Sequence, residues 1–192
     1  MVAGIADAVG YITMGGVFAA NMTGNTVLAG IAASKRDFVS VWDHLSPLVA
    51  FFIGAMIARL LLKALKSPAL GLLLEAALIA GVGFLPVGTE TAVMIVAFAM
   101  GLQASTVTSF AGAAVSTVVV TSTLARTADS VVDRIWPTEG RMPPTGVTNW
   151  LLVLTWSGYL VGAVIGAMLV DAMAYPLLVP AALLLLMFAV RE

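Results

Sequence analysis

The sequence contains no cysteine, a single histidine (His44) and few charged residues. The absence of cysteine excludes disulfides, zinc–thiolate sites and cysteine nucleophiles, and one histidine cannot supply a histidine-based metal cluster. The formal net charge of −1 lacks the basic excess that is typical of nucleic-acid binding. No carboxylates follow a metal-ligand spacing. We therefore expect no metal, no cofactor, no catalytic residues, no nucleic-acid partner and no enzymatic activity.

Hydrophobic residues, in contrast, are abundant. They make up 61% of the 192 residues, while charged residues make up 10%, and the mean hydropathy is +1.07. A soluble domain is closer to about half apolar and a quarter charged. The composition predicts an all-α membrane protein whose residues 1–192 form a single membrane domain. The first apolar run has no Lys or Arg before it and no clean cleavage site after it, which favours a membrane element over a signal peptide.

The apolar runs predict six transmembrane segments, at about 2–33, 46–65, 70–85, 91–128, 149–170 and 175–190. The first segment would be about 48 Å long as one straight helix, whereas the hydrocarbon core is about 30 Å thick. The fourth segment is longer still. We expect both to break near the membrane midplane, at Asn21–Asn25 and at Thr117–Thr123, with the two breaks approaching each other.

The two breaks resemble one another in sequence. Gly15-Gly16-Val17 matches Ala113-Ala114-Val115, and Met22-Thr23-Gly24-Asn25 matches Val120-Thr121-Ser122-Thr123, both 98 positions later (121 − 23). Ile53-Gly54-Ala55 likewise matches Val161-Gly162-Ala163, 108 positions later (162 − 54). These matches predict two inverted three-helix repeats, at about 1–87 and 91–192, with the first helix of each repeat broken.

Basic residues predict the orientation of these segments. With six crossings, one side carries Lys63, Lys66, Arg126, Arg134, Arg141 and Arg191, and the other carries only Lys35 and Arg36. The side richer in Lys and Arg is cytoplasmic in multi-spanning proteins. We therefore expect both termini in the cytoplasm and an external loop at about 35–44.

Polar residues at and near the breaks are the candidate substrate-binding residues: Asn21, Thr23, Gly24, Asn25, Gln103, Thr117, Thr121, Ser122 and Thr123. In the functional interpretation, each break starts a half-helix whose free N–H groups bind an anion or a polar oxygen at the centre. In the structural alternative, the same side chains form hydrogen bonds between helices and only stabilise packing.

Two acids and one glycine pattern complete the candidates. Asp7 is an acid within the first apolar segment, and we assign it to ion coupling, with a position near the membrane interface as the alternative. Glu75 is expected to reach the cytoplasmic headgroups beside Lys66, with a functional role as the alternative. Gly158, Gly162 and Gly166 form a four-residue pattern that permits close helix approach, either within the bundle or in a homodimer.

Four motifs resemble the YoaK family, a widespread group of small bacterial membrane proteins of unknown function. They are Gly4-Ile5-Ala6-Asp7-Ala8, Val17-Phe18-Ala19-Ala20-Asn21-Met22-Thr23-Gly24-Asn25, Gly101-Leu102-Gln103-Ala104 and Thr117-Val118-Val119-Val120-Thr121-Ser122-Thr123-Leu124. Ser122 stands where the family usually has glycine. The resemblance implies a multi-spanning protein of the bacterial inner membrane, and it implies no settled substrate.

The leading hypothesis for function is a small secondary transporter or facilitator with a central polar site between two broken helices. A channel would share this lining, and a lipid-binding or interaction protein would share the membrane segments without transport. No Lys or Arg lies within either break. We therefore expect a small polar or singly charged solute as the ligand, in addition to the lipid bilayer around the protein.

Overall fold

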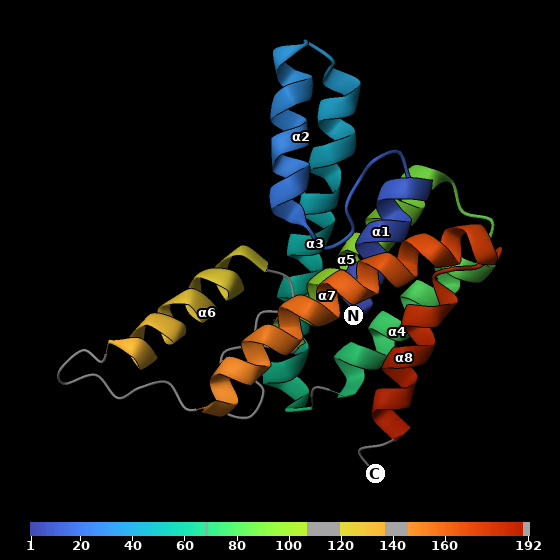
Figure 1. Cartoon of the computed structure of the whole chain (residues 1–192). Coiled ribbons are helices and arrows are strands. Elements are labelled where there is room, and N and C mark those ends of the chain that lie inside the picture. The colour runs from blue at the N-terminus through green and yellow to red at the C-terminus, as the bar shows by residue number, and fades with distance from the viewer. Residues whose placement is uncertain (68, 107–119, 137–145, 190–192) are drawn as a thin grey trace.

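The computed structural model describes residues 1–67, 69–106, 120–136 and 146–189, and all regular structure within these ranges is helical (Figure 1). Eight helices are found there: α1 (Val2–Thr13), α2 (Met22–Ser34), α3 (Phe38–Leu65), α4 (Ala69–Phe84), α5 (Thr89–Thr106), α6 (Val120–Ile135), α7 (Gly146–Ala172) and α8 (Leu178–Ala189). The predicted all-α class is confirmed.

The first apolar segment breaks, but before the predicted position: α1 ends at Thr13 and α2 begins at Met22, so residues 22–25 form the first turn of α2. Gly15 and Gly16 take φ angles of +74° and +76°, which only glycine adopts readily, and they turn the chain back along α1. A Cβ atom on Gly10 would lie 3.0 Å from the Val17 carbonyl oxygen, so the returning loop packs directly on α1. The turn therefore brings residues just before α2 beside the middle of α1 (Figure 1).

The predicted external loop at 35–44 is wrong in extent, because α3 begins at Phe38. Asp37 caps this helix, since its Oδ1 accepts the Ser40 N–H at 3.1 Å and its Oδ2 accepts the Ser40 hydroxyl at 2.6 Å. These hydrogen bonds lower the pKa of Asp37. The second segment was expected to begin at about residue 46, close to Pro47, but Pro47 lies buried inside α3. The α2–α3 pair forms a protruding hairpin (Figure 1).

The fourth apolar segment contains α5 and α6, and residues 107–119 between them lie outside the described residues, so its predicted break stays a prediction. The predicted meeting of the two breaks involves this range and stays a prediction. The described parts of α2 and α6 do not contact each other: α2 packs on α3, and α6 packs on α7. The predicted end of the fourth segment, at about 128, is wrong, because α6 extends to Ile135; the fifth segment, predicted from about 149, begins at Gly146.

Two helix crossings bring backbones into direct contact. A Cβ on Gly4 of α1 would lie 2.1 Å from the Tyr159 carbonyl oxygen of α7. A Cβ on Gly101 of α5 would lie 2.1 Å from the Phe51 carbonyl oxygen of α3. Side chains are therefore excluded at both crossings, and the helix pairs α1–α7 and α3–α5 form the centre of the fold. Helix α4 packs against α5 and α8 beside this centre.

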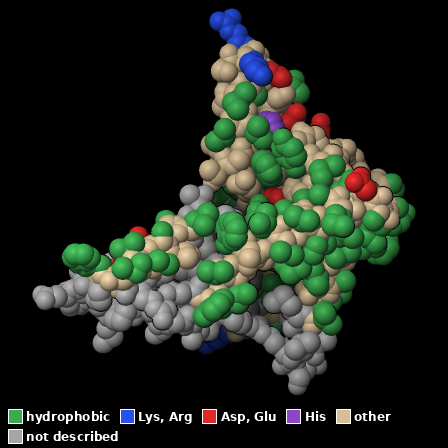
Figure 2. Space-filling model, viewed as in Figure 1, with side chains coloured by type: hydrophobic (Ala, Val, Ile, Leu, Met, Phe, Trp, Pro, Cys, Tyr) green, Lys and Arg blue, Asp and Glu red, His purple; other side chains and the backbone are tan. Residues whose placement is uncertain are grey.

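Large hydrophobic side chains remain exposed over much of the surface (Figure 2). On α3 they include Phe52, Met56 and Leu60, and on α7 they include Leu160, Val164 and Met168. Among the described residues, Phe38–Leu65 and Val153–Ala172 are long and apolar enough to cross a membrane. Figure 2 also shows basic side chains at the tip of the α2–α3 hairpin, with acidic ones nearer its base.

Candidate functional site

Asp7 on α1 fixes the loop of the first break. Its Oδ1 accepts the Ala20 N–H at 2.6 Å and the Asn21 N–H at 3.1 Å. Its Oδ2 accepts the Tyr159 hydroxyl of α7 at 2.5 Å. Asp7 is buried, with 2% of its surface exposed. Backbone N–H groups just before a helix have no helical partner, and this carboxyl group supplies one. Ion coupling by Asp7 stays a prediction.

The Asn side chains of the motif also form hydrogen bonds with the chain's own backbone, and Gly24 lies close to the Phe18 ring. Asn21 caps α2, because its Oδ1 accepts the Gly24 N–H at 3.1 Å. Asn25 is fully buried and holds Phe18 at two points: its Oδ1 accepts the Phe18 N–H at 2.9 Å, and its Nδ2 donates to the Phe18 carbonyl at 2.7 Å. A Cβ on Gly24 would lie 2.8 Å from the Phe18 ring. The motif therefore closes a tight loop around Phe18.

The remaining predicted site residues are not brought together with this motif by any described contact. Thr23 is exposed on the first turn of α2, and Gln103 is buried on α5, where it binds Glu75. Thr117 lies outside the described residues. Thr121, Ser122 and Thr123 lie in the first turn of α6, and their side chains are outside the description. Solute binding by this set stays a prediction.

Glu75 and Gln103 form a second buried polar contact, between α4 and α5. The Gln103 amide Nε2 donates to Glu75 Oε1 at 2.9 Å, and Glu75 is fully buried. The expectation that Glu75 reaches the headgroups is therefore wrong, because its side chain points to α5. Among the described residues, its second oxygen, Oε2, is buried without a hydrogen-bond partner, and so is the hydroxyl of Thr106, three residues after Gln103.

Two adjoining hollows open beside the first break. The first, which we call the acidic hollow, has a volume of about 270 Å³ and lies between the break loop and helices α3 and α5. Its lining includes Met14, Gly15, Val17, Trp42, Asp43, Ser46, Thr89, Glu90, Val93 and Met94. No Lys or Arg is among these residues. Two carboxylates, two hydroxyls and an indole ring can together receive a small polar or positively charged group.

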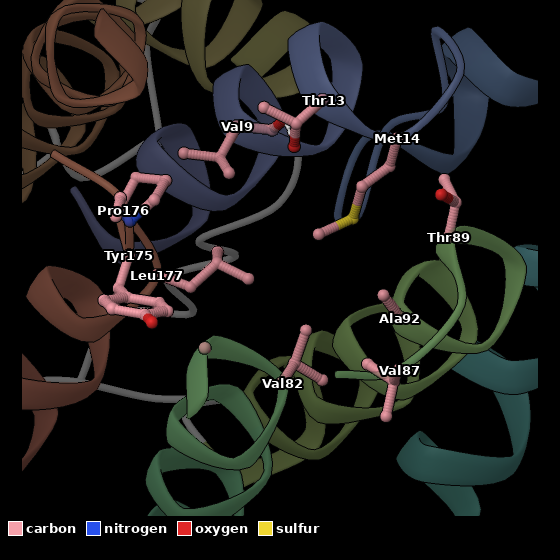
Figure 3. A pocket seen from close by; sticks show the side chains of 12 residues that line it. Val9, Thr13, Met14, Val82, Val87, Thr89, Ala92, Tyr175, Pro176 and Leu177 are labelled. Atoms are coloured by element: carbon pink, nitrogen blue, oxygen red, sulfur yellow. Dashed lines mark hydrogen bonds between the residues drawn. The ribbon is translucent and has the colours of Figure 1, made fainter. Parts of the chain in front are cut away.

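The second hollow has a volume of about 240 Å³ and shares Met14 and Thr89 with the acidic hollow. Figure 3 shows it between α1, the end of α4 and the segment before α8, with Val9, Val82 and Leu177 facing its interior. Met14 therefore stands between the two spaces. Neither hollow is lined by the Asn21–Asn25 motif, so the break contributes its first residues, Met14 to Val17, rather than its polar motif.

Sequence reasoning missed Tyr159, Asp43 and Glu90. Tyr159 carries a hydroxyl inside an apolar segment, which is a signal of a buried polar partner. Asp43 and Glu90 lie at the expected external ends of two helices, where acids are common. Only the folded arrangement of α3 and α5 shows that both carboxylates line one hollow.

The three glycines at four-residue spacing on α7 already have a packing partner within the same chain. A Cβ on Gly162 would lie 2.3 Å from the Met1 carbonyl oxygen, and one on Gly166 would lie 2.8 Å from that of Ile5. Gly158 also faces Met1. These glycines pack on α1, which corresponds to the bundle alternative. A homodimer through the same face would have to displace α1.

The family model for a protein of unknown function, DUF1275, matches residues 1–190. The chain is 34% identical over 149 residues to the UPF0700 transmembrane protein YoaK of Bacillus subtilis (strain 168). That match covers 71% of this chain and 65% of the relative, so it spans about two thirds of the relative's length. No solved structure matches the chain. The resemblance to the YoaK family is thus confirmed, and the chain is a membrane protein that belongs to the DUF1275 family, whose function is unknown.

Proposed function

We propose that this protein is a secondary transporter for a small solute, with the acidic hollow as the solute's entry. The observation that carries the proposal is that the loop of the broken helix lines this hollow through Met14, Gly15 and Val17. Irregular backbone at membrane depth is tolerated only where it is buried in protein or lines a cavity. Broken helices beside a cavity are a recurring feature of substrate sites in secondary transporters.

The helix crossings support the proposed pair of inverted three-helix repeats. A Cβ on Gly4 would meet the Tyr159 carbonyl and the Ala163 N–H, and one on Gly101 would meet the Phe51 carbonyl and the Ala55 N–H. The contacted residues are 108 positions apart in both cases (159 − 51, 163 − 55), the same offset as the sequence match between Gly54 and Gly162. The two glycines are 97 positions apart (101 − 4), close to the offset of 98 between the breaks, so the two crossings support the proposed two-fold relation of the halves.

This pairing suggests which parts would move. Each crossing joins the first helix of one repeat to the second helix of the other, as α1 with α7 and α3 with α5. Direct backbone contact leaves little freedom within either pair. Alternating access would therefore proceed by rocking of the α1–α7 pair against the α3–α5 pair, with the break loop and Met14 between them.

The membrane placement we propose has six crossings in the bacterial inner membrane and both termini in the cytoplasm. Lys63 and Lys66 at the end of α3 would then lie inside, and Lys35 and Arg36 at the hairpin tip would lie outside. Both hollows are lined by residues at the external ends of the helices. The acidic hollow would therefore face the periplasm or the medium.

The lining of the acidic hollow favours a neutral polar solute or a monovalent cation. Asp43 and Glu90 disfavour anions, and a volume of about 270 Å³ is below the usual range for drug-sized ligands, roughly 300–1,000 Å³. The test is flux into proteoliposomes of three probes: methylammonium, glycerol and acetate. Saturable uptake with counterflow of methylammonium or glycerol is expected. Flux that rises linearly without saturation would indicate a channel, and no flux of any probe would refute transport of these solutes.

Two matched variants connect the flux to the hollow. Asp43→Asn combined with Glu90→Gln should raise the KM for methylammonium, whereas Asp171→Asn, an exposed acid outside the hollow, should not.

The chain has no native cysteine, so a single introduced thiol can be blocked selectively. A bulky maleimide on Met94→Cys should stop flux, and the same reagent on Met56→Cys, which is exposed on α3, should have no effect.

A further inference from the structure

The contact between α4 and α5 contains a carboxyl group with an unused oxygen. Glu75 is fully buried, and its Oε1 accepts the Gln103 amide at 2.9 Å. In the part of the chain that the structure describes, neither its Oε2 nor the buried hydroxyl of Thr106 has a hydrogen-bond partner. Gln103 and Thr106 lie three residues apart and therefore on one face of α5. Buried polar atoms without partners are rare, and each calls for an explanation such as a bound ion or a catalytic or exchangeable proton.

No described positive charge balances Glu75. It is the only titratable residue of α4, and the described residues of α8 include none. On α5 the only titratable residue is Glu90, at the opposite end of the helix. On α3, Arg59 and Lys63 are exposed, and Asp43 and His44 lie near the helix start, away from the α4–α5 contact. An ionised carboxylate without a counter-charge is strongly disfavoured in an apolar interior.

A metal ion does not fit this position well, because Na⁺ or Ca²⁺ would need several oxygen ligands around a cavity. A Cβ on Gly71, one helical turn before Glu75, would lie 2.5 Å from the Thr106 hydroxyl oxygen. The two helices are thus in close contact here, and neither hollow includes Glu75. A proton, in contrast, needs no cavity. It would sit on Oε2 while Oε1 accepts the amide of Gln103.

We propose that Glu75 is an exchangeable proton site, positioned by Gln103 and distinct from Asp7. The two acids differ in their surroundings. Both oxygens of Asp7 accept hydrogen bonds, from two backbone N–H groups and the Tyr159 hydroxyl, and this arrangement holds the break loop. Glu75 has one such donor and one free oxygen, so adding or removing its proton breaks no hydrogen bond of the fold.

Infrared spectroscopy of the purified full chain in D₂O tests this proposal directly. A protonated carboxyl group absorbs apart from the amide and carboxylate bands. We expect one such band that disappears reversibly as the pH rises, is absent from Glu75→Gln, and persists in Glu90→Gln, the matched control on α5. A band that never changes with pH would indicate a static hydrogen bond and overturn the proposal. So would a Glu75→Gln spectrum identical to that of the parent. Loss of the band on adding NaCl at fixed pH would assign the site to sodium instead.

A second variant keeps Glu75 and tests its partner, which matters if Glu75→Gln folds poorly. Gln103→Met has a similar shape but cannot donate to Oε1. Since a hydrogen bond to a carbonyl lowers its stretching frequency, the Glu75 band should move to higher wavenumber in Gln103→Met and should still titrate. An unmoved band would contradict the assignment of Gln103 as the positioning residue.

The connection between this proton site and solute movement rests on the proposed function. In proteoliposomes, Glu75→Gln should lose uptake driven by a proton gradient while keeping solute exchange, because exchange needs no net proton transfer. The two proposals fail separately. A titrating Glu75 band in a protein without flux would refute transport and leave the proton site, whereas proton-driven uptake that survives in Glu75→Gln would refute the coupling role of Glu75.

Discussion

Asp7 on α1 and Tyr159 on α7 share a hydrogen bond of 2.5 Å although 152 positions separate them in the chain. The same carboxyl group holds the two N–H groups that precede α2. One buried side chain thus connects the broken helix of the first half to the second helix of the other half. This connection explains why a single acid occurs inside an apolar run, and it leads to the first prediction.

Tyr159→Phe should lower the free energy of unfolding by about 1–3 kcal/mol, because the buried Asp7 oxygen loses its donor. Adding Asp7→Asn should cost less than the sum of the two single changes, with a coupling of about 0.5–3 kcal/mol. Denaturant unfolding in detergent measures these values. Tyr175→Phe removes the hydroxyl of an exposed tyrosine and should have little effect. Strict additivity of the two changes would refute the connection.

Asn25→Leu should destabilise the protein, because both hydrogen bonds to Phe18 are lost and two partly buried backbone groups remain unpaired. A fully buried group of this kind costs about 1–3 kcal/mol, and a partly buried one costs less. Thr23→Val is the matched comparison: Thr23 is exposed, so its stability effect should stay within about 0.5 kcal/mol. If Thr23→Val nevertheless weakens solute uptake at normal folding yield, the original assignment of Thr23 to the binding site gains direct support.

Gly101→Ala and Gly54→Ala should each destabilise the fold by about 1–3 kcal/mol or more, because the added methyl group meets backbone rather than a movable side chain. Gly30 and Gly81 also lie inside helices but have open space around the Cβ position. Gly30→Ala and Gly81→Ala should therefore be neutral or stabilising, by up to about 1 kcal/mol. Thermal unfolding in detergent distinguishes the two groups, and equal effects in all four variants would contradict the crossings.

The proposed orientation predicts different access to two introduced thiols. Lys35→Cys, at the tip of the α2–α3 hairpin, should react with a membrane-impermeant maleimide in intact cells. Lys66→Cys, at the other end of α3, should react only after the cells are opened. Both positions are exposed in the folded chain, so burial cannot explain a difference. The opposite pattern would invert the topology.

The sequence predicted the elements that depend on local composition. The helix at 70–85 and the span at 149–170 agree with α4 and α7, because long apolar runs are local signals. A break in the first segment was predicted from its Gly/Asn cluster, but at Asn21–Asn25 rather than between Thr13 and Met22. The start of α3 was wrong, since the Asp37 cap outweighed the proline ten positions later. The partners of Asp7 and Glu75 could not be predicted, because both lie on other helices and follow from tertiary packing.

The same tertiary packing explains why the polar motif was assigned to a solute. Asn21 and Asn25 are of a residue type that is common in binding sites. Composition alone cannot distinguish an Asn that binds a ligand from an Asn that binds the backbone of its own loop. The hydrogen bonds to Gly24 and Phe18 make that distinction here. Asp43 and Glu90, in contrast, are ordinary acids at helix ends until the fold places them around one hollow.

The pairing of α1 with α7 has a consequence for biosynthesis. The ribosome completes Asp7 152 residues before Tyr159, and at about 5–20 residues per second this delay lasts roughly 8–30 s. Throughout that time α1 has no partner for Gly4, and its carboxyl group lacks the tyrosine hydroxyl. The newly made first half must therefore wait in the insertion machinery or in lipid with an unpaired acid. Slowing translation between the two halves should for this reason lower the yield of folded protein and increase degradation by membrane proteases.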